Sequence, residues 1–378
     1  MRIVVLDESK SGEPRVAVTP ETVKKYAGLG ASVTVQSGAG MLSGIPDSDF
    51  EAAGATVAKD MKGALAEADI LLSVGRPEKA KVKGIKTGAL ALAVMNPYGA
   101  EAELKPLAEA GLSCFAMELM PRITRAQVMD VLSSQANLAG YRAVVDGAAE
   151  FGRAIPMMMT AAGTVPAARI FIMGVGVAGL QAIATARRMG GVVTATDVRP
   201  ATKEQVESLG AKFLAVEDDE FKQAQTAGGY AKEMSKDYQA KQAALTASHI
   251  AKQDIVITTA LIPGRPAPRL ITKEMVATMR PGSVIVDLAV ERGGNCELAK
   301  AGEVVVTDNG VKIVGHGNLA TRLAPTSSSL YARNLFAFLE TMVDKKEKKL
   351  AVNWDDELVK ATLLTREGSL VHAMFQPK

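Results

Sequence analysis

A glycine-rich segment between an apolar run and a helical pattern is the feature that most constrains the fold of this 378-residue chain. Gly174, Gly176 and Gly179 have G-x-G-x-x-G spacing, follow the apolar run Arg169–Met173 and open the helical pattern Leu180–Met189. In a dinucleotide-binding unit the first glycine makes a tight turn, the second lets the backbone approach a pyrophosphate, and the third lets the helix pack on the sheet. The helix N-terminus would supply amide donors to the phosphates.

An acidic residue stands where this kind of unit requires one. Asp197 directly follows the apolar run Val192–Thr196, at a distance from the glycines that suits the motif. Its carboxylate can accept hydrogen bonds from adenosine ribose hydroxyls and would repel a 2′-phosphate, which favours NAD over NADP. Arg199 weakens this preference slightly, because an arginine can hold a 2′-phosphate.

Short apolar runs alternate with helical patterns along the whole chain, which is typical of parallel sheets. The runs that predict a first sheet are Ile3–Leu6, Ser32–Gln36, Ile70–Val74, Leu90–Met95 and Cys114–Met117. Those that predict a second sheet are Arg169–Met173, Val192–Thr196, Lys212–Val216, Asp254–Thr258 and Ser283–Asp287. A tight hairpin is expected at Asp308-Asn309-Gly310, and a helix capped by Thr19 lies between the first two runs.

The expected fold class is therefore α/β, with two Rossmann-like domains, parallel sheets and an NAD cleft between the domains. The first domain is expected to comprise residues 1–135 and 321–378 and has no glycine fingerprint. The helical pattern Ser327–Val343 returns the chain to this domain. Residues 136–320 are expected to form the NAD-binding domain.

Composition excludes several classes of function. The net charge is only +3 and aromatic residues make up 4% of the chain, which argues against nucleic-acid binding. Cys114, Cys296 and the three histidines are scattered, so neither a metal site nor a disulfide scaffold is expected. No apolar stretch is long enough to cross a bilayer, and no signal peptide is evident. We expect a soluble intracellular protein.

The polar stretch 121–134 is the first candidate for the chemistry. If a helix is already running at Gln127, then Gln127, Asp130 and Ser134 share one face, with Ser133 beside it and Arg122 before it. Such a set suits a carboxamide and ribose hydroxyls better than acid–base work. An equally weighted alternative is that residues 124–127 form a capping box and that Asp130 merely favours a first helical turn.

Three further segments and one histidine can be interpreted from the sequence. Residues 227–234 carry a glycine hinge and could be a lid over a cofactor or a plain surface loop. Residues 258–264 end a predicted strand and are expected to line the cofactor cleft. Met157–Met159 are expected to be core filler rather than an adaptable dimer contact. His316 is the histidine with most functional promise, although a structural role is favoured.

Long stretches of the chain resemble the NAD(H)-binding α subunit of proton-translocating NAD(P) transhydrogenases. These stretches are Met117–Arg122, Ser134–Arg142, Pro156–Gly163, Gly228–Met234 and Val286–Cys296. Alanine dehydrogenases share the fold and some motifs, such as Arg15–Pro20.

The resemblance implies a set of site residues. Arg122, Gln127, Asp130 and Ser133 would hold the nicotinamide and its ribose and serve as the catalytic set. The cofactor-binding set would be Gly174, Val175, Gly176, Val177, Gly179, Asp197, Val198, Arg199, Gly229, Tyr230 and Leu261. Within it, Gly229 and Tyr230 belong to a mobile loop that closes over the nucleotide, and Leu261 belongs to the cleft wall.

The resemblance also implies the activity and the partners. Members of this family are homodimers that dock on an NADP(H)-binding domain carried by a membrane partner. Hydride passes directly between the two nicotinamides, and the partner couples this transfer to proton translocation. The chain would then be cytoplasmic, peripheral to the inner (plasma) membrane through its partner subunits, without inserting into the bilayer itself.

The departures from alanine dehydrogenase bear on the choice of reaction. The substrate-binding lysine and catalytic histidine of those enzymes correspond to Gly75 and Asn96 here. Reductive amination without either group is chemically implausible, whereas transfer between nicotinamides needs no proton donor. The alternatives are an alanine-dehydrogenase-like amino-acid dehydrogenase and a non-catalytic NAD sensor.

Overall fold

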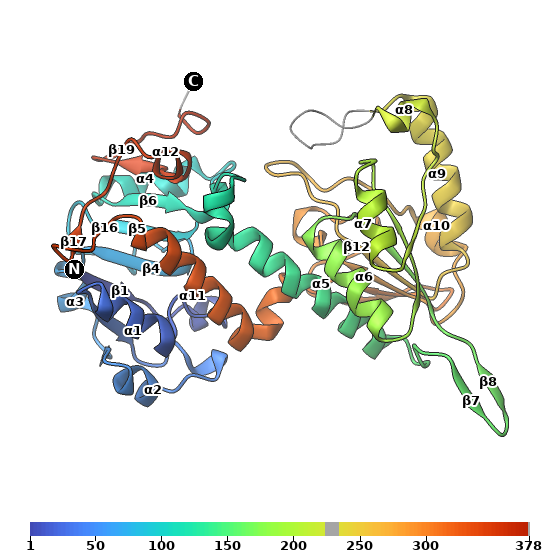
Figure 1. The fold of residues 1–378 in the computed structure, drawn as a ribbon, viewed down its shortest axis with the longest axis horizontal. Coiled ribbons are helices and arrows are strands. Elements are labelled where there is room, and N and C mark those ends of the chain that lie inside the picture. Colours follow the sequence, from blue (N-terminus) through green and yellow to red (C-terminus); the bar gives the residue numbers. More distant parts are fainter. Residues whose placement is uncertain (224–233, 377–378) are drawn as a thin grey trace. The chain divides into compact units, whose positions relative to one another are not determined.

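The computed structural model describes residues 1–223 and 234–376, and the chain divides into two compact units. Unit 1 comprises Met1–Gln135 and Leu323–Lys378, and unit 2 comprises Ala136–Arg322. Each unit contains one large, mainly parallel sheet with helices packed on both faces (Figure 1). The predicted α/β class with Rossmann-like sheets is confirmed.

The sheet of unit 1 has six parallel strands. They are β1 (Arg2–Val5), β2 (Ser32–Gln36), β3 (Thr56–Ala58), β4 (Ile70–Gly75), β5 (Leu90–Val94) and β6 (Ser113–Ala116), in the order β3-β2-β1-β4-β5-β6. This is a doubly wound order, in which the winding reverses between β1 and β4. The five predicted strands are present, whereas the short and partly exposed β3 was not predicted.

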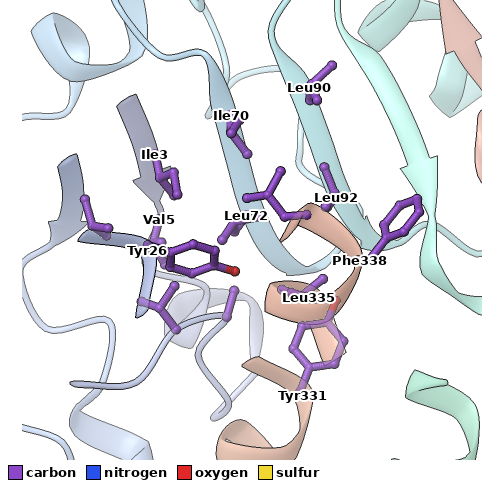
Figure 2. Close-up of a cluster of buried hydrophobic side chains, with 14 of the residues drawn as sticks. Ile3, Val5, Tyr26, Ile70, Leu72, Leu90, Leu92, Tyr331, Leu335 and Phe338 are labelled. Atoms are coloured by element: carbon purple, nitrogen blue, oxygen red, sulfur yellow. The ribbon is translucent and has the colours of Figure 1, made fainter. Parts of the chain in front are cut away.

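Alternate residues of these strands face opposite layers of helices. Ile3, Val5 and Leu72 belong to the core beneath α1 (Pro20–Gly28) and α11 (Ala324–Glu340). Val4 and Leu71 face α3 (Lys62–Ala66) and α4 (Glu101–Glu109) instead. Figure 2 shows Tyr331, Leu335 and Phe338 of α11 lying against the strands, with Tyr26 of α1 nearby. Helix α11 is therefore fixed on the sheet by apolar burial along one face.

The sheet of unit 2 has seven strands. They are β9 (Arg169–Met173), β10 (Val192–Thr196), β11 (Lys212–Phe213), β12 (Ile255–Thr258), β13 (Val284–Asp287), β14 (Val304–Val306) and β15 (Lys312–Val314), in the order β11-β10-β9-β12-β13-β15-β14. All neighbouring pairs are parallel except β14 and β15, which form the predicted hairpin. The winding reverses between β9 and β12, so ligands are expected beyond the carboxyl ends of these two strands.

Two layers of helices cover this sheet. Helices α6 (Val177–Arg188) and α7 (Thr202–Ser208), with the second half of α5 (Val131–Glu150), pack over one face. Helices α9 (Lys236–Ile250) and α10 (Lys273–Ala277) pack over the other. Gly140 lets α5 approach α6 closely, because a Cβ atom there would lie 2.0 Å from the carbonyl oxygen of Ala178.

Several short elements complete the fold. The remaining α-helices are α2 (Asp47–Ala52), α8 (Asp219–Lys222) and α12 (Glu357–Thr362). The 3-10 helices are Ser9–Ser11, Met41–Ser43, Met117–Leu119, Thr124–Met129, Val290–Arg292 and Leu319–Leu323. Two small ribbons are β16 (Val343–Asp344) with β17 (Lys349–Leu350), and β18 (Thr365–Arg366) with β19 (Ser369–Leu370). Among the described residues, none of the helices combines the length and apolar character needed to cross a bilayer.

The three adjacent methionines are not core filler, and that prediction is wrong. Strands β7 (Met158–Thr160) and β8 (Gly163–Val165) form an antiparallel hairpin that extends from the rest of unit 2 (Figure 1). Met157, Met158 and Met159 are 61%, 42% and 80% exposed. The arm lies beyond the two cores of unit 2, so its apolar side chains have no layer of helices to cover them.

Candidate functional site

The turn after β9 has the geometry of a dinucleotide turn. Gly174 has a positive φ of 100°, and a Cβ atom there would lie 2.6 Å from Oγ1 of Thr259. A Cβ atom on Gly179 would lie 1.9 Å from the carbonyl oxygen of Gly174. Any side chain at either position would push the turn away from the sheet, so both positions require glycine.

The first turn of α6 is suited to an anion. Gly176 is its N-cap in an extended conformation, and no described side chain accepts a hydrogen bond from the first turn. A Cβ atom on Gly176 would meet nothing within 4 Å in the part of the chain that the structure describes. Backbone N–H groups at a helix start need acceptors, and the helix dipole favours a negative one. A pyrophosphate therefore fits this turn.

Asp197 follows β10 directly, and its carboxylate already accepts several internal hydrogen bonds. Oδ2 accepts the backbone N–H of Val175 at 2.7 Å. Arg199 donates its backbone N–H and Nε to Oδ1 and an Nη to Oδ2, each at 2.9 Å. A further bond joins the guanidinium to the carbonyl of Val175 at 3.1 Å, and the bonds to Asp197 raise the pKa of Arg199. A ribose hydroxyl could reach this carboxylate only by sharing it with Arg199 or displacing it.

Exposed apolar side chains lie beyond the same strand ends. Val177 begins α6, Val198 follows β10, and Leu261 follows β12; they are 40%, 45% and 51% exposed. Because β9, β10 and β12 are parallel neighbours, all three residues lie at one edge of the sheet. The predicted residues Gly229 and Tyr230 lie outside the described residues.

Two residues that sequence reasoning missed support this edge. Thr259 donates a hydrogen bond from its hydroxyl to the carbonyl of Gly174 at 3.0 Å. The fully buried Asn295 accepts the N–H of Ala260 at 3.1 Å and donates to the carbonyls of Ala260 and Pro268 at 2.9 and 2.8 Å. One carboxamide thus holds both ends of the exposed segment that contains Leu261. Their only sequence signal was membership of segments already singled out.

The polar stretch of unit 1 is not one continuous helix. Residues Thr124–Met129 form a 3-10 helix, Asp130 is extended, and α5 begins at Val131. The expected common face of Gln127, Asp130 and Ser134 is therefore wrong, as is the capping box, since no described side chain caps this 3-10 helix. Asp130 instead accepts the N–H and hydroxyl of Ser133 at 2.9 and 2.6 Å at the start of α5. The alternative role for Asp130, at a first helical turn, is confirmed.

Buried and exposed residues alternate along this stretch. Ala126, Met129 and Val131 are buried in the core of unit 1. Arg122 and Gln127 are exposed, while Asp130 and Ser133 are half-buried. The apolar residues anchor the segment and leave the four predicted nicotinamide contacts at the surface of unit 1.

Carboxylates of the chain itself occupy the corresponding sheet edge of unit 1. Glu8, in the turn after β1, accepts the N–H groups of Val74 and Gly75 at 2.7 and 2.9 Å. Glu118 accepts those of Met95, at 3.0 Å, and Asn96. Burial raises the pKa of Glu8 to about 7 and also raises that of Glu118. In a nucleotide-binding sheet of this winding, the ligand lies at the turn after the first strand. In unit 1 the side chain of Glu8 takes this place.

His249 makes structural contacts, whereas His316 lies beyond the carboxyl end of β15, which pairs in parallel with β13. His249 lies with Nε2 2.8 Å from the hydroxyl of Thr194 and packs edge-on against Phe171. Burial lowers its pKa. His316 follows β15 and is half-buried.

A doubly wound sheet with a glycine turn at its point of reversal defines a Rossmann-like nucleotide-binding protein. The models for the N-terminal and C-terminal domains of alanine dehydrogenase/PNT match residues 4–139 and 143–373. The chain belongs to this alanine dehydrogenase/PNT family.

Within the family the similarity is uneven. An NAD(P) transhydrogenase subunit alpha protein of Rhodospirillum rubrum is 55% identical over 98% of this chain and 98% of its own length. A crystal structure of transhydrogenase from Sinorhizobium meliloti is 60% identical, has a TM-score of 0.89, and is matched over 98% of this chain and 100% of that one. Alanine dehydrogenase of Halomonas elongata is 29% identical over 98% and 95%. The predicted resemblance to transhydrogenase α subunits is confirmed and is favoured over the dehydrogenase alternative.

Substitution of Glu8 tests whether its carboxylate fills the edge of unit 1. A raised pKa means that the folded protein holds a proton that the unfolded chain releases, so this contribution to stability is lost as the pH rises through about 7. Between about pH 5 and about pH 8, we expect the wild type to lose about 1–3 kcal/mol more unfolding free energy than Glu8→Gln in urea titrations. Identical pH profiles for the two proteins would contradict the assignment.

Proposed function

We propose that this chain is the NAD(H)-binding subunit of an NAD(P) transhydrogenase and transfers hydride directly between NADH and NADP⁺ bound on a partner subunit. One observation carries the proposal. Unit 2 has a dinucleotide turn, while the strand ends of unit 1 present Gly75 and Asn96 where a dehydrogenase of this family would have a lysine and a histidine. Similarity to named transhydrogenase subunits supports the same conclusion.

In this proposal the residues of the chain bind and orient rather than move protons. The Gly174 turn and the start of α6 receive the pyrophosphate, and Val177, Val198 and Leu261 surround the adenosine half. Arg122 and Gln127 orient the nicotinamide carboxamide, while Asp130 and Ser133 hold the ribose. The nicotinamide supplies the hydride, and holding the donor and acceptor rings in a reactive geometry accounts for the acceleration.

The preference for NAD over NADP is assigned to Asp197 and Arg199 together. A 2′-phosphate at this edge would meet the carboxylate of Asp197, which repels it. The guanidinium of Arg199 could bind such a phosphate, but Asp197 already holds it through two hydrogen bonds. The ion pair therefore suppresses a nearby group that would accept the 2′-phosphate of NADP.

Removing the carboxylate should release this suppression. We expect Asp197→Ser to bind NADP at least about ten-fold more tightly than the wild type, since one charge-assisted hydrogen bond is worth about 1.5–3 kcal/mol. The double variant Asp197→Ser/Arg199→Ala should lose this gain. Equilibrium titrations with NAD and NADP would measure both, and an unchanged NADP affinity in Asp197→Ser would remove Arg199 from the explanation.

We also propose that the chain works as a homodimer, bound through its partner subunits to the cytoplasmic side of the inner membrane. The β7–β8 hairpin supports dimer formation, because it carries three exposed methionines on an arm outside both cores of its unit. Methionine adapts well to apolar contact surfaces.

Charge on this arm should separate the subunits if it is the dimer contact. We expect Met158→Asp/Met159→Asp to shift the protein from dimer to monomer in sedimentation velocity. Met41→Asp is the matched control, because Met41 is 58% exposed and belongs to unit 1, whereas the hairpin belongs to unit 2. A dimer that survives the double substitution would place the interface elsewhere.

The central activity can be tested with purified components. The protein would be mixed with NADPH, an NAD analogue whose reduced form absorbs distinctly, and a soluble NADP-binding domain from a related transhydrogenase. Reduction of the analogue should require that domain. A parallel reaction would contain pyruvate, ammonia and NADH without the domain. Turnover there alone would establish an amino-acid dehydrogenase instead, and nucleotide binding without transfer in either reaction would indicate a sensor.

A further inference from the structure

One side chain of α11 holds the segment that carries the four proposed nicotinamide contacts. Asn334 donates a hydrogen bond from Nδ2 to the carbonyl of Val128 at 2.8 Å. Its Oδ1 accepts the hydroxyl of Ser134 at 2.7 Å. Asn334 is buried, with 7% of the residue exposed, and both bonds are partly buried. A single carboxamide therefore supplies one donor and one acceptor to two points of the same segment.

These two points alternate with the proposed contacts along the chain. Val128 follows Gln127, and Ser134 follows Ser133. Asp130 lies between them and is the extended residue that joins the 3-10 helix to α5. Helical hydrogen bonding is interrupted at this join, so its shape depends on the bonds of Asp130 to Ser133 and on contacts from outside the segment. The bonds to Asn334 fix the chain on both sides of it.

Asn334 is itself held in place by the sheet. Its neighbours on α11, Tyr331, Leu335 and Phe338, are fully buried against the strands (Figure 2). Apolar burial of these three side chains fixes the helix on the sheet. The carboxamide thus transmits the position of the sheet of unit 1 to the polar segment.

A second anchor is of a different kind. Arg125 lies within the 3-10 helix and donates two hydrogen bonds to Asp356, at 3.0 and 2.7 Å, and further bonds to Glu357 at the start of α12. The guanidinium is 44% exposed, so salt and water screen this contact. It holds the beginning of the segment, whereas Asn334 contacts the residues on either side of Asp130.

We propose that Asn334 is a positioning residue for hydride transfer, acting through Val128 and Ser134 on the orientation of Gln127, Asp130 and Ser133. This inference rests on the proposed function. Aspartate at this position keeps an acceptor for Ser134 but has no donor for Val128, and leucine keeps neither bond. Small displacements of a positioning segment strongly slow a reaction that depends on geometry.

The test compares Asn334→Asp, Asn334→Leu and Ser134→Ala in the two-component transfer reaction at saturating nucleotide. We expect the transfer rate to fall about 10- to 100-fold in Asn334→Leu and less in each variant that loses one bond. The NADH dissociation constant should change by less than about three-fold, because the glycine turn of unit 2 supplies most of the binding. The double variant Asn334→Asp/Ser134→Ala should resemble Asn334→Leu.

Tyr331→Phe is the matched control, because it keeps the apolar ring that packs α11 on the sheet and removes only the buried hydrogen bonds from the hydroxyl to the carbonyls of Ser73 and Val74, at 2.9 and 3.1 Å, one turn earlier on the same helix. It should lower stability while leaving the transfer rate per folded molecule unchanged. Amide hydrogen exchange gives a readout that does not need the partner: residues 124–134 should exchange faster in the Asn334 variants and not in Tyr331→Phe. Transfer and exchange that follow stability alone across all variants would overturn the role of Asn334. Failure of the wild type to transfer hydride would overturn the proposed function, and exchange would still decide whether Asn334 anchors the segment.

Discussion

The parallel pairing of strands is the constraint on which the candidate sites of this chain depend. In a parallel sheet the carboxyl ends of all strands meet at one edge, and their backbone N–H groups and following loops converge there. In unit 2 this brings the turn at Gly174 beside Thr259, although the two are far apart in sequence. Backbone groups at such an edge need partners, and the two units satisfy this requirement in opposite ways.

In unit 1, carboxylates of the unit itself accept hydrogen bonds from the backbone N–H groups at this edge. Glu8 reaches from the turn after β1 to the end of β4, and Glu118 does the same for β5. Unit 2 has Gly176 at the start of α6, where a Cβ atom would meet nothing within 4 Å among the described residues, so an external anion fits there. Two sheets of the same winding therefore have different roles, decided by the residues in their first turns. The polar segment of unit 1 is a separate device, built on a core of apolar anchors.

Local sequence patterns predicted much of this structure, but they could not predict contacts between residues that are far apart in the sequence. Strands β9 and β10 have the predicted bounds, and the glycine spacing correctly implied a tight turn. The break at Asp130 was missed, because helical spacing continues through it while its conformation follows from side-chain bonds to Ser133. No local pattern links Val128 to Asn334 or Glu8 to Gly75. The methionine arm was misjudged because composition alone does not distinguish a buried apolar segment from one on an exposed hairpin.

In the proposed function, recognition of the ribose by Asp197 is an exchange of hydrogen bonds, because internal donors already occupy its carboxylate. Arg199 already donates hydrogen bonds to both carboxylate oxygens of Asp197, so a ribose hydroxyl must replace bonds that are present in the free protein. The net binding free energy is then the contribution of the new ribose contacts less that of the Arg199 bonds that are lost. A nucleotide bound with this smaller net free energy dissociates readily, because Arg199 forms its hydrogen bonds to Asp197 again as the ribose leaves. In the proposed transhydrogenase, which must release one redox form of the nucleotide before it takes up the other, competition from Arg199 would shorten the time for which each nucleotide stays bound.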